Sequence, residues 1–143
     1  LIQPRLHYKG ETMSFADIAQ LYQLADAYVS PYMAEGFNMP VLEAAACGLP
    51  VICTAGGSTD DFTRDEFALR IRSDEMAAPQ FAPDAMMLKP DLDQLTAHMM
   101  NVVKNRDIGR RAREAGPRFV NENYTWKHVV DRLLAVLFPD AVA

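Results

Sequence analysis

The sequence predicts an α/β domain in which a Rossmann-like, mainly parallel sheet is flanked by helices. Short apolar runs alternate with segments of helical periodicity through the first half of the chain, and the connections are long enough to cross over between parallel strands. The chain has 143 residues, of which 50% are hydrophobic, so it makes one domain with a substantial core. We expect a single unit, residues 1–143, with its strand and helix core within about 5–72 and wrapping helices within about 91–138.

The expected core elements follow one another as strand, helix, strand, helix, strand and strand. Ser14 is a suitable N-cap for the first helix, in which apolar residues recur at helical spacing, and Asp26 ends that helix. Gly48 closes the second helix, and the third strand stops before the pair Gly56 and Gly57. The expected strands are residues 5–9, 27–30, 51–54 and 67–72, and the expected helices are residues 15–25 and 39–47.

The last third of the chain is predicted to be helical. Asp91 caps a first helix, and Asp107 begins a second, which Pro117 should kink or interrupt. Residues 127–138 form a final amphipathic helix. Residues 73–90, between the core and these helices, are expected to make a surface excursion, because three prolines punctuate this stretch.

The loop of residues 31–38 lies where a ligand site is expected, because open parallel sheets bind ligands outside the carboxyl ends of their strands. Asn38 can cap the following helix, with Met39 and Pro40 at its first two positions. The free N–H groups and the dipole of a helix start attract a phosphate or a sugar oxygen. Gly36 allows the backbone to approach such a ligand closely.

Two carboxylates flank this helix start. Glu43 falls five residues after the presumed cap, whereas a capping-box glutamate falls three after it. Its helix is otherwise apolar or small, so this carboxylate needs a partner, and a ribose diol is a suitable one. Glu35, in the loop, is placed to hold sugar hydroxyls in the same way. The alternative is that Glu35 is a solvated loop acid and that Glu43 pairs with an arginine.

The string EGFNMPVLEAAACGLPVICTAGG, which begins at Glu35, resembles the signature of the family 4 glycosyltransferases. That signature is an E-x7-E motif followed by a small-residue helix, Gly-x-Pro-Val and a Gly-Gly loop. The segments LYQLADAYVSPY and FVNENYTW resemble neighbouring parts of the same family, so the likeness covers most of the chain. By this resemblance the chain is similar to the C-terminal, donor-binding domain of a retaining glycosyltransferase with two Rossmann domains (the GT-B fold).

The resemblance implies a role for each residue of the motif. Glu35 is then the catalytic residue and contacts the transferred sugar, and Glu43 holds the ribose of a nucleoside-diphosphate sugar. Between them the donor contacts are Gly36, Phe37, Asn38, Met39, Val41 and Leu42. The family transfers the sugar with retention and without a metal ion or other cofactor, while preorganised positive groups stabilise the leaving diphosphate.

The same resemblance implies that parts of the donor domain lie outside this chain. The family domain has two further strand and helix units, whose loops carry the Arg and Lys that neutralise the diphosphate. In the family, the strands of the sheet lie in the spatial order 3-2-1-4-5-6, and residues 5–9 would be strand 3 and residues 27–30 strand 4. Strands 1 and 2, which belong between these two, would then be missing, and the sheet would have a gap. We therefore expect an incomplete domain that rearranges, pairs with another chain as a homo-oligomer, or belongs to a longer enzyme with its own N-terminal acceptor domain.

Other features narrow the function. The net charge of −5 and the pI near 5.1 disfavour a nucleic-acid partner. No basic stretch leads into an apolar block, and Cys47 and Cys53 lack metal spacing, so a cytoplasmic, reduced protein is expected. No G-x-G-x-x-G follows a strand, which disfavours a dehydrogenase. The chain also has a cluster of basic residues: Arg110, Arg111, Arg113 and Arg118. This cluster is either a solvated helix face or a peripheral contact with anionic lipid.

The remaining polar candidates have structural interpretations. Asp60 and Asp61 follow the Gly-Gly pair, where turn chemistry favours acids. The three histidines, His7, His98 and His128, lack ligand spacing. The leading hypothesis is a donor-binding domain that is inactive in isolation, and the alternative is a non-catalytic nucleotide-binding or protein-interaction module.

Overall fold

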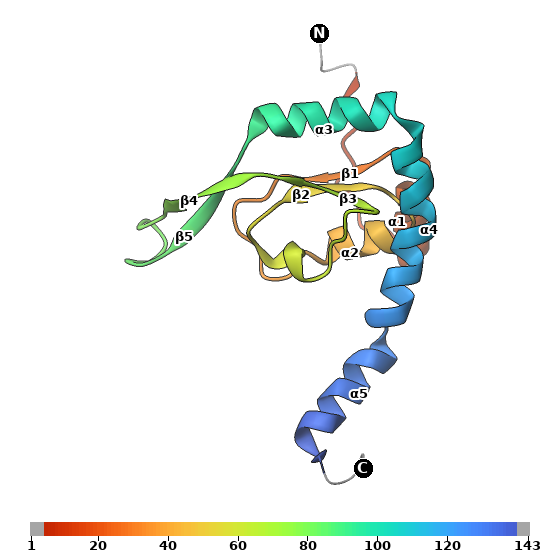
Figure 1. The fold of residues 1–143 in the computed structure, drawn as a ribbon, viewed down its shortest axis with the longest axis vertical. Helices are drawn as coiled ribbons and strands as arrows, with labels where there is room; N and C mark the ends of the chain where they lie inside the picture. Colours follow the sequence, from red (N-terminus) through yellow and green to blue (C-terminus); the bar gives the residue numbers. More distant parts are fainter. Residues whose placement is uncertain (1–4, 140–143) are drawn as a thin grey trace.

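The computed structural model describes residues 5–139 and contains a three-stranded parallel sheet between helices. The strands β1 (Tyr28–Ser30), β2 (Val51–Thr54) and β3 (Ala68–Ile71) lie in the order β1-β2-β3. Helix α2 (Met39–Ala46) packs on β1 and β2, and α3 (Leu92–Lys104) packs on β2 and β3 from the opposite face (Figure 1). The predicted α/β class with a Rossmann-like parallel sheet is confirmed.

The core is centred on β2, whose four residues are all fully buried. A parallel strand with neighbours on both edges and helices on both faces has no exposed side, which explains the continuous apolar run of its sequence. One face of α2, including Val41 and Ala45, completes this core. The Cys53 thiol is buried, which raises its pKa, whereas Cys47 is only partly buried.

Side-chain caps determine where most of the helices begin. Ser14 and Asp17 form a capping box at α1 (Phe15–Leu24). Asp91 accepts a hydrogen bond from the N–H of Gln94 at 2.9 Å at the start of α3, as predicted. The next helix, α4 (Arg106–Asn123), begins just before the expected Asp107, because Asn105 caps it. The final helix, α5 (Trp126–Leu137), is capped by Thr125.

Helix α4 continues through Pro117, so the expectation that this proline interrupts the helix is wrong. A proline removes one backbone hydrogen bond and crowds the preceding turn, but packing can offset that cost. The residues Ile108, Ala112 and Gly116 recur every four positions and are buried, and α4 packs on α2. This tertiary contact runs along the helix up to the turn that contains the proline.

The expected strand at residues 5–9 is absent, since these residues pair with neither outer strand of the sheet β1-β2-β3. These residues are exposed, with Leu6 68% and Tyr8 93% accessible. A lone extended segment gains neither ladder hydrogen bonds nor burial. The expected gap between residues 5–9 and 27–30 is therefore not present either, because residues 5–9 are not part of the sheet.

The surface excursion of residues 73–90 contains a hairpin that the sequence did not reveal. Strands β4 (Ser73–Ala77) and β5 (Met86–Pro90) pair antiparallel and extend away from the main sheet (Figure 1). The sequence of β4, SDEMA, lacks the β-branched and aromatic residues that signal a strand. The excursion is confirmed, and its internal order is a new observation.

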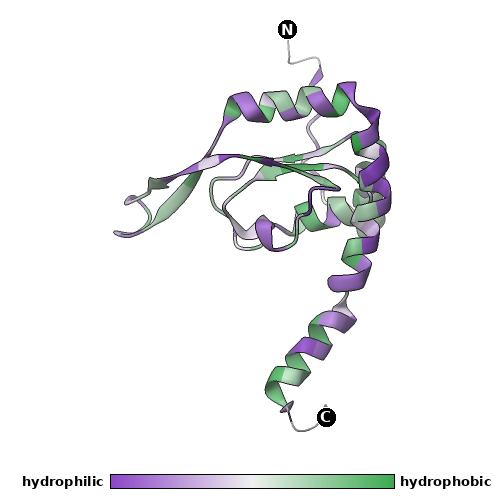
Figure 2. Cartoon of the chain, in the orientation of Figure 1, coloured by the Kyte–Doolittle hydropathy of each residue, from purple (hydrophilic) through white to green (hydrophobic). Residues whose placement is uncertain are grey.

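Helix α5 leaves the main body and has no buried residue (Figure 1). Its sequence places apolar side chains on the surface, seen as green segments in Figure 2, including Leu133 at 54% and Val136 at 78% exposure. Helices α3 and α4 wrap the core as expected, whereas α5 does not. None of the helices described within residues 5–139 combines the length and the apolar character needed to cross a bilayer.

Candidate functional site

A cavity of about 270 Å³ opens beyond the carboxyl ends of β1 and β2. Three segments line it: residues 32–35 after β1, residues 56–58 after β2, and Glu75 with residues 86–88 from the hairpin β4–β5. This is the end of a parallel sheet at which ligands bind in open α/β folds. The first segment contains Glu35, so the loop that the sequence singled out does border a cavity.

Tyr32 connects the loop after β1 to the loop after β2 through buried hydrogen bonds. Its hydroxyl donates to the carbonyl of Thr54 at 3.0 Å and lies 2.8 Å from the hydroxyl of Thr59, while Thr54 donates to the carbonyl of Tyr32 at 2.7 Å. All three residues are buried. Gly57 lies directly against this cluster, since a Cβ at that position would come within 2.7 Å of the Tyr32 hydroxyl. The loop after β2 therefore requires glycine for steric reasons.

Asp60 closes the Gly-Gly loop as a turn residue. Its Oδ2 accepts from the N–H of Gly56 at 2.8 Å, and Gly56 has a positive φ of 85°. The other oxygen, Oδ1, is buried and has no partner within residues 5–139. The structural interpretation of Asp60 from the sequence accounts for this contact.

Glu35 is exposed where it lines the cavity, and the next residue, Gly36, is exposed as well. Within the described part of the chain, the Glu35 carboxylate has no hydrogen-bond or ion-pair partner. No atom lies within 4 Å of the position that a Cβ on Gly36 would occupy, so the space beside this backbone is open. Both residues are accessible to a ligand, as the sequence predicts.

Phe37 attaches the loop to the core. Its ring stacks on that of Phe62, with centroids 4.8 Å apart and an interplanar angle of 26°. Phe62 is fully buried, whereas Phe37 is 37% exposed. The Phe37 side chain thus holds the loop in place, and only its backbone and ring edge remain for a ligand.

Asn38 precedes α2 but does not cap it through its side chain, which corrects the expectation. Its backbone is left-handed, with φ 66°, and its Nδ2 donates to the Ser30 hydroxyl at 3.0 Å. The side chain is therefore turned toward β1 rather than along the helix. The backbone N–H groups of Phe37, Asn38 and Met39 have no acceptor among the residues that the structure describes.

The positions that follow in α2 differ in accessibility. Met39 is 52% exposed, whereas Val41 is fully buried and Leu42 is 7% exposed. Both buried residues belong to the core cluster beneath the helix start. Of the predicted donor contacts in α2, Met39 is the one with substantial accessible surface next to the loop.

Glu43 lies apart from the cavity and faces α1. The Tyr22 hydroxyl donates to its Oε2 at 3.4 Å, and no arginine pairs with it in the part of the chain that is described. Burial, and after it the negative charge of Glu43, raises the pKa of Tyr22 above its ordinary value. Burial also raises the pKa of Tyr28, with contributions from Glu43 and Glu35 in that order. Of the two glutamates, Glu35 lines the smaller cavity and Glu43 does not.

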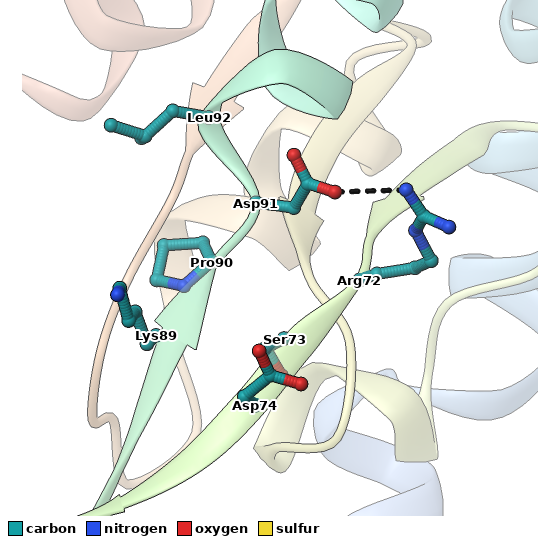
Figure 3. A pocket seen from close by; sticks show the side chains of 7 residues that line it. All are labelled: Arg72, Ser73, Asp74, Lys89, Pro90, Asp91 and Leu92. Atoms are coloured by element: carbon teal, nitrogen blue, oxygen red, sulfur yellow. Dashed lines mark hydrogen bonds and ion pairs between the residues drawn. The ribbon is translucent and has the colours of Figure 1, made fainter.

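A second, larger cavity of about 460 Å³ lies at the base of the hairpin and the start of α3 (Figure 3). Residues 72–74 and 89–92 line it. The Arg72 guanidinium, which lines this cavity, forms an ion pair with the Asp91 carboxylate at 2.8 Å. The N–H of Gln94, and after it Arg72, lowers the pKa of Asp91. This cavity contains none of the residues that the sequence singled out.

Cationic and metal-ligating groups are scarce around the smaller cavity. No Lys or Arg lines it, and residues 5–139 contain no group of three or more His, Cys, Asp or Glu placed to hold a metal ion. Sequence reasoning missed Tyr32 and Glu75, which reach the cavity from a buried position and from the hairpin. Neither lies in a recognisable motif, although Tyr32 directly follows the strand in the segment AYVSPY.

The fold is an open parallel α/β domain with a cavity at the carboxyl ends of its strands, where domains of this class bind ligands. The sequence model of the family described as Glycosyl transferases group 1 matches residues 1–101. The chain belongs to this family.

Curated relatives agree with this assignment. The chain is 32% identical over 128 residues to a D-inositol 3-phosphate glycosyltransferase of Salinispora tropica, which covers 89% of the chain and 23% of the relative. It is 26% identical over 114 residues to the O-antigen chain mannosyltransferase B of Escherichia coli, covering 78% and 25%. It is 25% identical over 124 residues to an MMP alpha-(1->4)-mannosyltransferase of Mycolicibacterium hassiacum, covering 87% and 27%. The chain thus spans about a quarter of the length of these relatives.

Proposed function

We propose that this chain is the donor-binding domain of a retaining family 4 glycosyltransferase of the GT-B type, which transfers a hexose from a nucleoside-diphosphate sugar to an acceptor. The observation that carries the proposal is the start of α2. Three consecutive backbone N–H groups there have no acceptor among the described residues, and they lie beside a loop that borders a cavity. Free N–H groups at a helix start, aided by the helix dipole, suit a diphosphate.

The proposed roles follow the accessible groups. Glu35 accepts hydrogen bonds from hydroxyls of the sugar at the cavity, and the N–H groups of residues 37–39 bind the diphosphate. Glu43 accepts from the ribose hydroxyls, with the Tyr22 hydroxyl holding its carboxylate in orientation. The buried Val41 and Leu42 act as the floor of the nucleoside site, through the backbone and through the little surface that Leu42 exposes.

Neutralisation of the leaving diphosphate requires positive charge that the cavity lacks. No Lys or Arg lines the cavity in the part of the chain that is described. We propose that these cations, and the acceptor site, come from other segments of a longer enzyme, since the relatives are about four times as long. The chemistry needs no metal ion, because preorganised cations and N–H groups can stabilise the developing charge.

Titration calorimetry of the longer enzyme with UDP, GDP and ADP tests the donor site, because the proposed diphosphate-binding cations come from its other segments. We expect one of the three to bind, and Glu43→Ala to weaken its binding by at least about tenfold, because a charge-assisted hydrogen bond is lost. Glu114→Ala is the matched control, since Glu114 is also a helical glutamate but is exposed on α4. Retention is tested separately, by the anomeric configuration of the product of the full enzyme.

Absence of binding for all three nucleotides would overturn the proposal and favour a protein-interaction module with the same fold. Equal nucleotide affinities of the unaltered protein and the Glu43→Ala variant would show that Glu43 does not contact the nucleotide. Thermal melting of each variant checks that the loss of the Tyr22 contact leaves the domain folded.

A further inference from the structure

The hairpin β4–β5 borders both cavities, the smaller one through Glu75 and residues 86–88 and the larger one through its base, residues 73–74 and 89–90. In its register Ser73 pairs with Pro90 and Glu75 with Leu88, so these residues share a face, while Asp74 lies on the other face. Glu75 and Leu88 line the smaller cavity, and Asp74 lines the larger one (Figure 3). The hairpin is therefore a wall shared by two separate cavities, with a carboxylate toward each.

The base of the hairpin is fixed to both loops of the candidate site. The N–H of Leu88 donates to the carbonyl of Met33 at 2.7 Å, and the Ser73 hydroxyl donates to the carbonyl of Ala55 at 2.6 Å. A Cβ on Gly57 would come within 3.0 Å of Leu88, so the hairpin and the Gly-Gly loop are in close contact. These contacts hold the wall against the cavity.

The lining groups favour a particular ligand chemistry. Glu75 and Glu35 come from different segments, and neither has a hydrogen-bond or ion-pair partner within residues 5–139. The Ser58 hydroxyl also lines the cavity and is buried without a partner in the described part of the chain. Met86 and Leu88 add apolar surface. Two free carboxylates, a hydroxyl and an apolar wall suit a neutral polyol and repel a phosphate.

We propose that Glu75 is a specificity-determining residue that accepts a hydrogen bond from a hydroxyl of the transferred sugar, while Met86 and Leu88 pack against the apolar face of its ring. The inference rests on the proposed function. In this proposal the sugar binds against the hairpin β4–β5, and the diphosphate binds at the start of α2.

The test measures how much the sugar adds to binding. Dissociation constants are determined for the pairs GDP and GDP-mannose, UDP and UDP-glucose, and ADP and ADP-glucose, and the ratio within each pair gives the contribution of the sugar. For the pair that binds, we expect Glu75→Gln and Glu75→Ala to reduce this ratio by about tenfold, the loss of one charge-assisted hydrogen bond. The free nucleotide carries about one more negative charge than its sugar ester at neutral pH, so the ratio also contains a change in repulsion, and a control that removes a nearby carboxylate measures that change.

Asp74→Asn is the matched control, because it removes a carboxylate from the same strand but from the opposite face. It should lower the ratio less than either Glu75 substitution does. A ratio unaffected by both Glu75 substitutions, a ratio lowered equally by Asp74→Asn, or a sugar that adds nothing in the unaltered chain would overturn the inference while nucleotide binding persists. Failure of every nucleotide to bind would instead overturn the proposed function, and this inference with it.

Discussion

At the scale of single residues, the Tyr22 hydroxyl contacts the carboxylate of Glu43, the second glutamate of the motif. The Tyr22 ring also meets Tyr28 edge to face, with centroids 5.7 Å apart. Tyr22 thus connects α1 both to β1 and to the carboxylate on α2. Because burial and the Glu43 charge disfavour a tyrosinate, the pKa of Tyr22 is higher in the folded state.

This raised pKa predicts a loss of stability in alkali. Above about pH 10, the ordinary pKa of tyrosine, the unfolded chain releases the Tyr22 proton while the folded chain retains it, so the free energy of unfolding falls as pH rises. Tyr22→Phe should make this fall shallower, measured by urea unfolding at several pH values. The control Tyr8→Phe removes the hydroxyl of a 93% exposed ring and should leave the profile unchanged. Identical slopes for Tyr22→Phe and the unaltered chain would contradict this assignment.

The spacing of Glu35 and Glu43 in the sequence identified both residues but not their surroundings. Glu43 falls outside a capping box and lies in a helix of small residues, which indicated a need for a partner. That partner, Tyr22, lies 21 residues earlier, and only the packing of α1 on α2 brings the two together. Likewise, nothing local in the sequence indicated that Asn38 would turn toward Ser30.

At the scale of elements, the crossing of α2 and α4 depends on Gly116. A Cβ at this position would overlap the carbonyl oxygen of Ala45 and lie 3.2 Å from its carbonyl carbon. The backbones of the two helices approach closely there, and neither can yield without disturbing the core. Since α2 carries the candidate site, this contact also sets the position of the helix start.

Gly116→Ala should therefore destabilise the domain by about 1–3 kcal/mol, the usual cost of overpacking. Gly109→Ala in the same helix is the matched control, because no atom lies within 4 Å of its Cβ position. That control should raise stability by up to about 1 kcal/mol through helix propensity. Urea unfolding measures both variants, and a Gly116→Ala variant as stable as the control would show that the helices can move apart.

Helices and strands that are marked by nearby capping residues or apolar runs were predicted well from the sequence. Strands that depend on pairing with a distant segment were not. Ser14 and Asp91 cap the helices that they were expected to cap, and Val51–Thr54 is a strand as expected. Residues 5–9 resemble a strand but pair with no strand in the structure, whereas the charged β4 pairs because β5 returns beside it. Pairing partners are tertiary information that periodicity does not contain.

At the scale of the whole molecule, α5 stands apart from the rest. It has no buried residue, and its twelve residues are too few to form a stable helix in water without packing. We expect its amides to exchange with deuterium much faster than those of α4, which is packed on α2. Hydrogen exchange followed by mass spectrometry measures this, and equal protection of the two helices would mean that α5 has a packing partner in solution.

The central claim is that a nucleoside diphosphate binds at the start of α2, beside the smaller cavity. Amide chemical shifts recorded by NMR during titration with the nucleotide that binds locate the site most directly. The account predicts that the largest shifts fall on residues 36–39 and 56–58, at the carboxyl ends of β1 and β2. Shifts confined to residues 72–74 and 89–92, around the larger cavity, would contradict it.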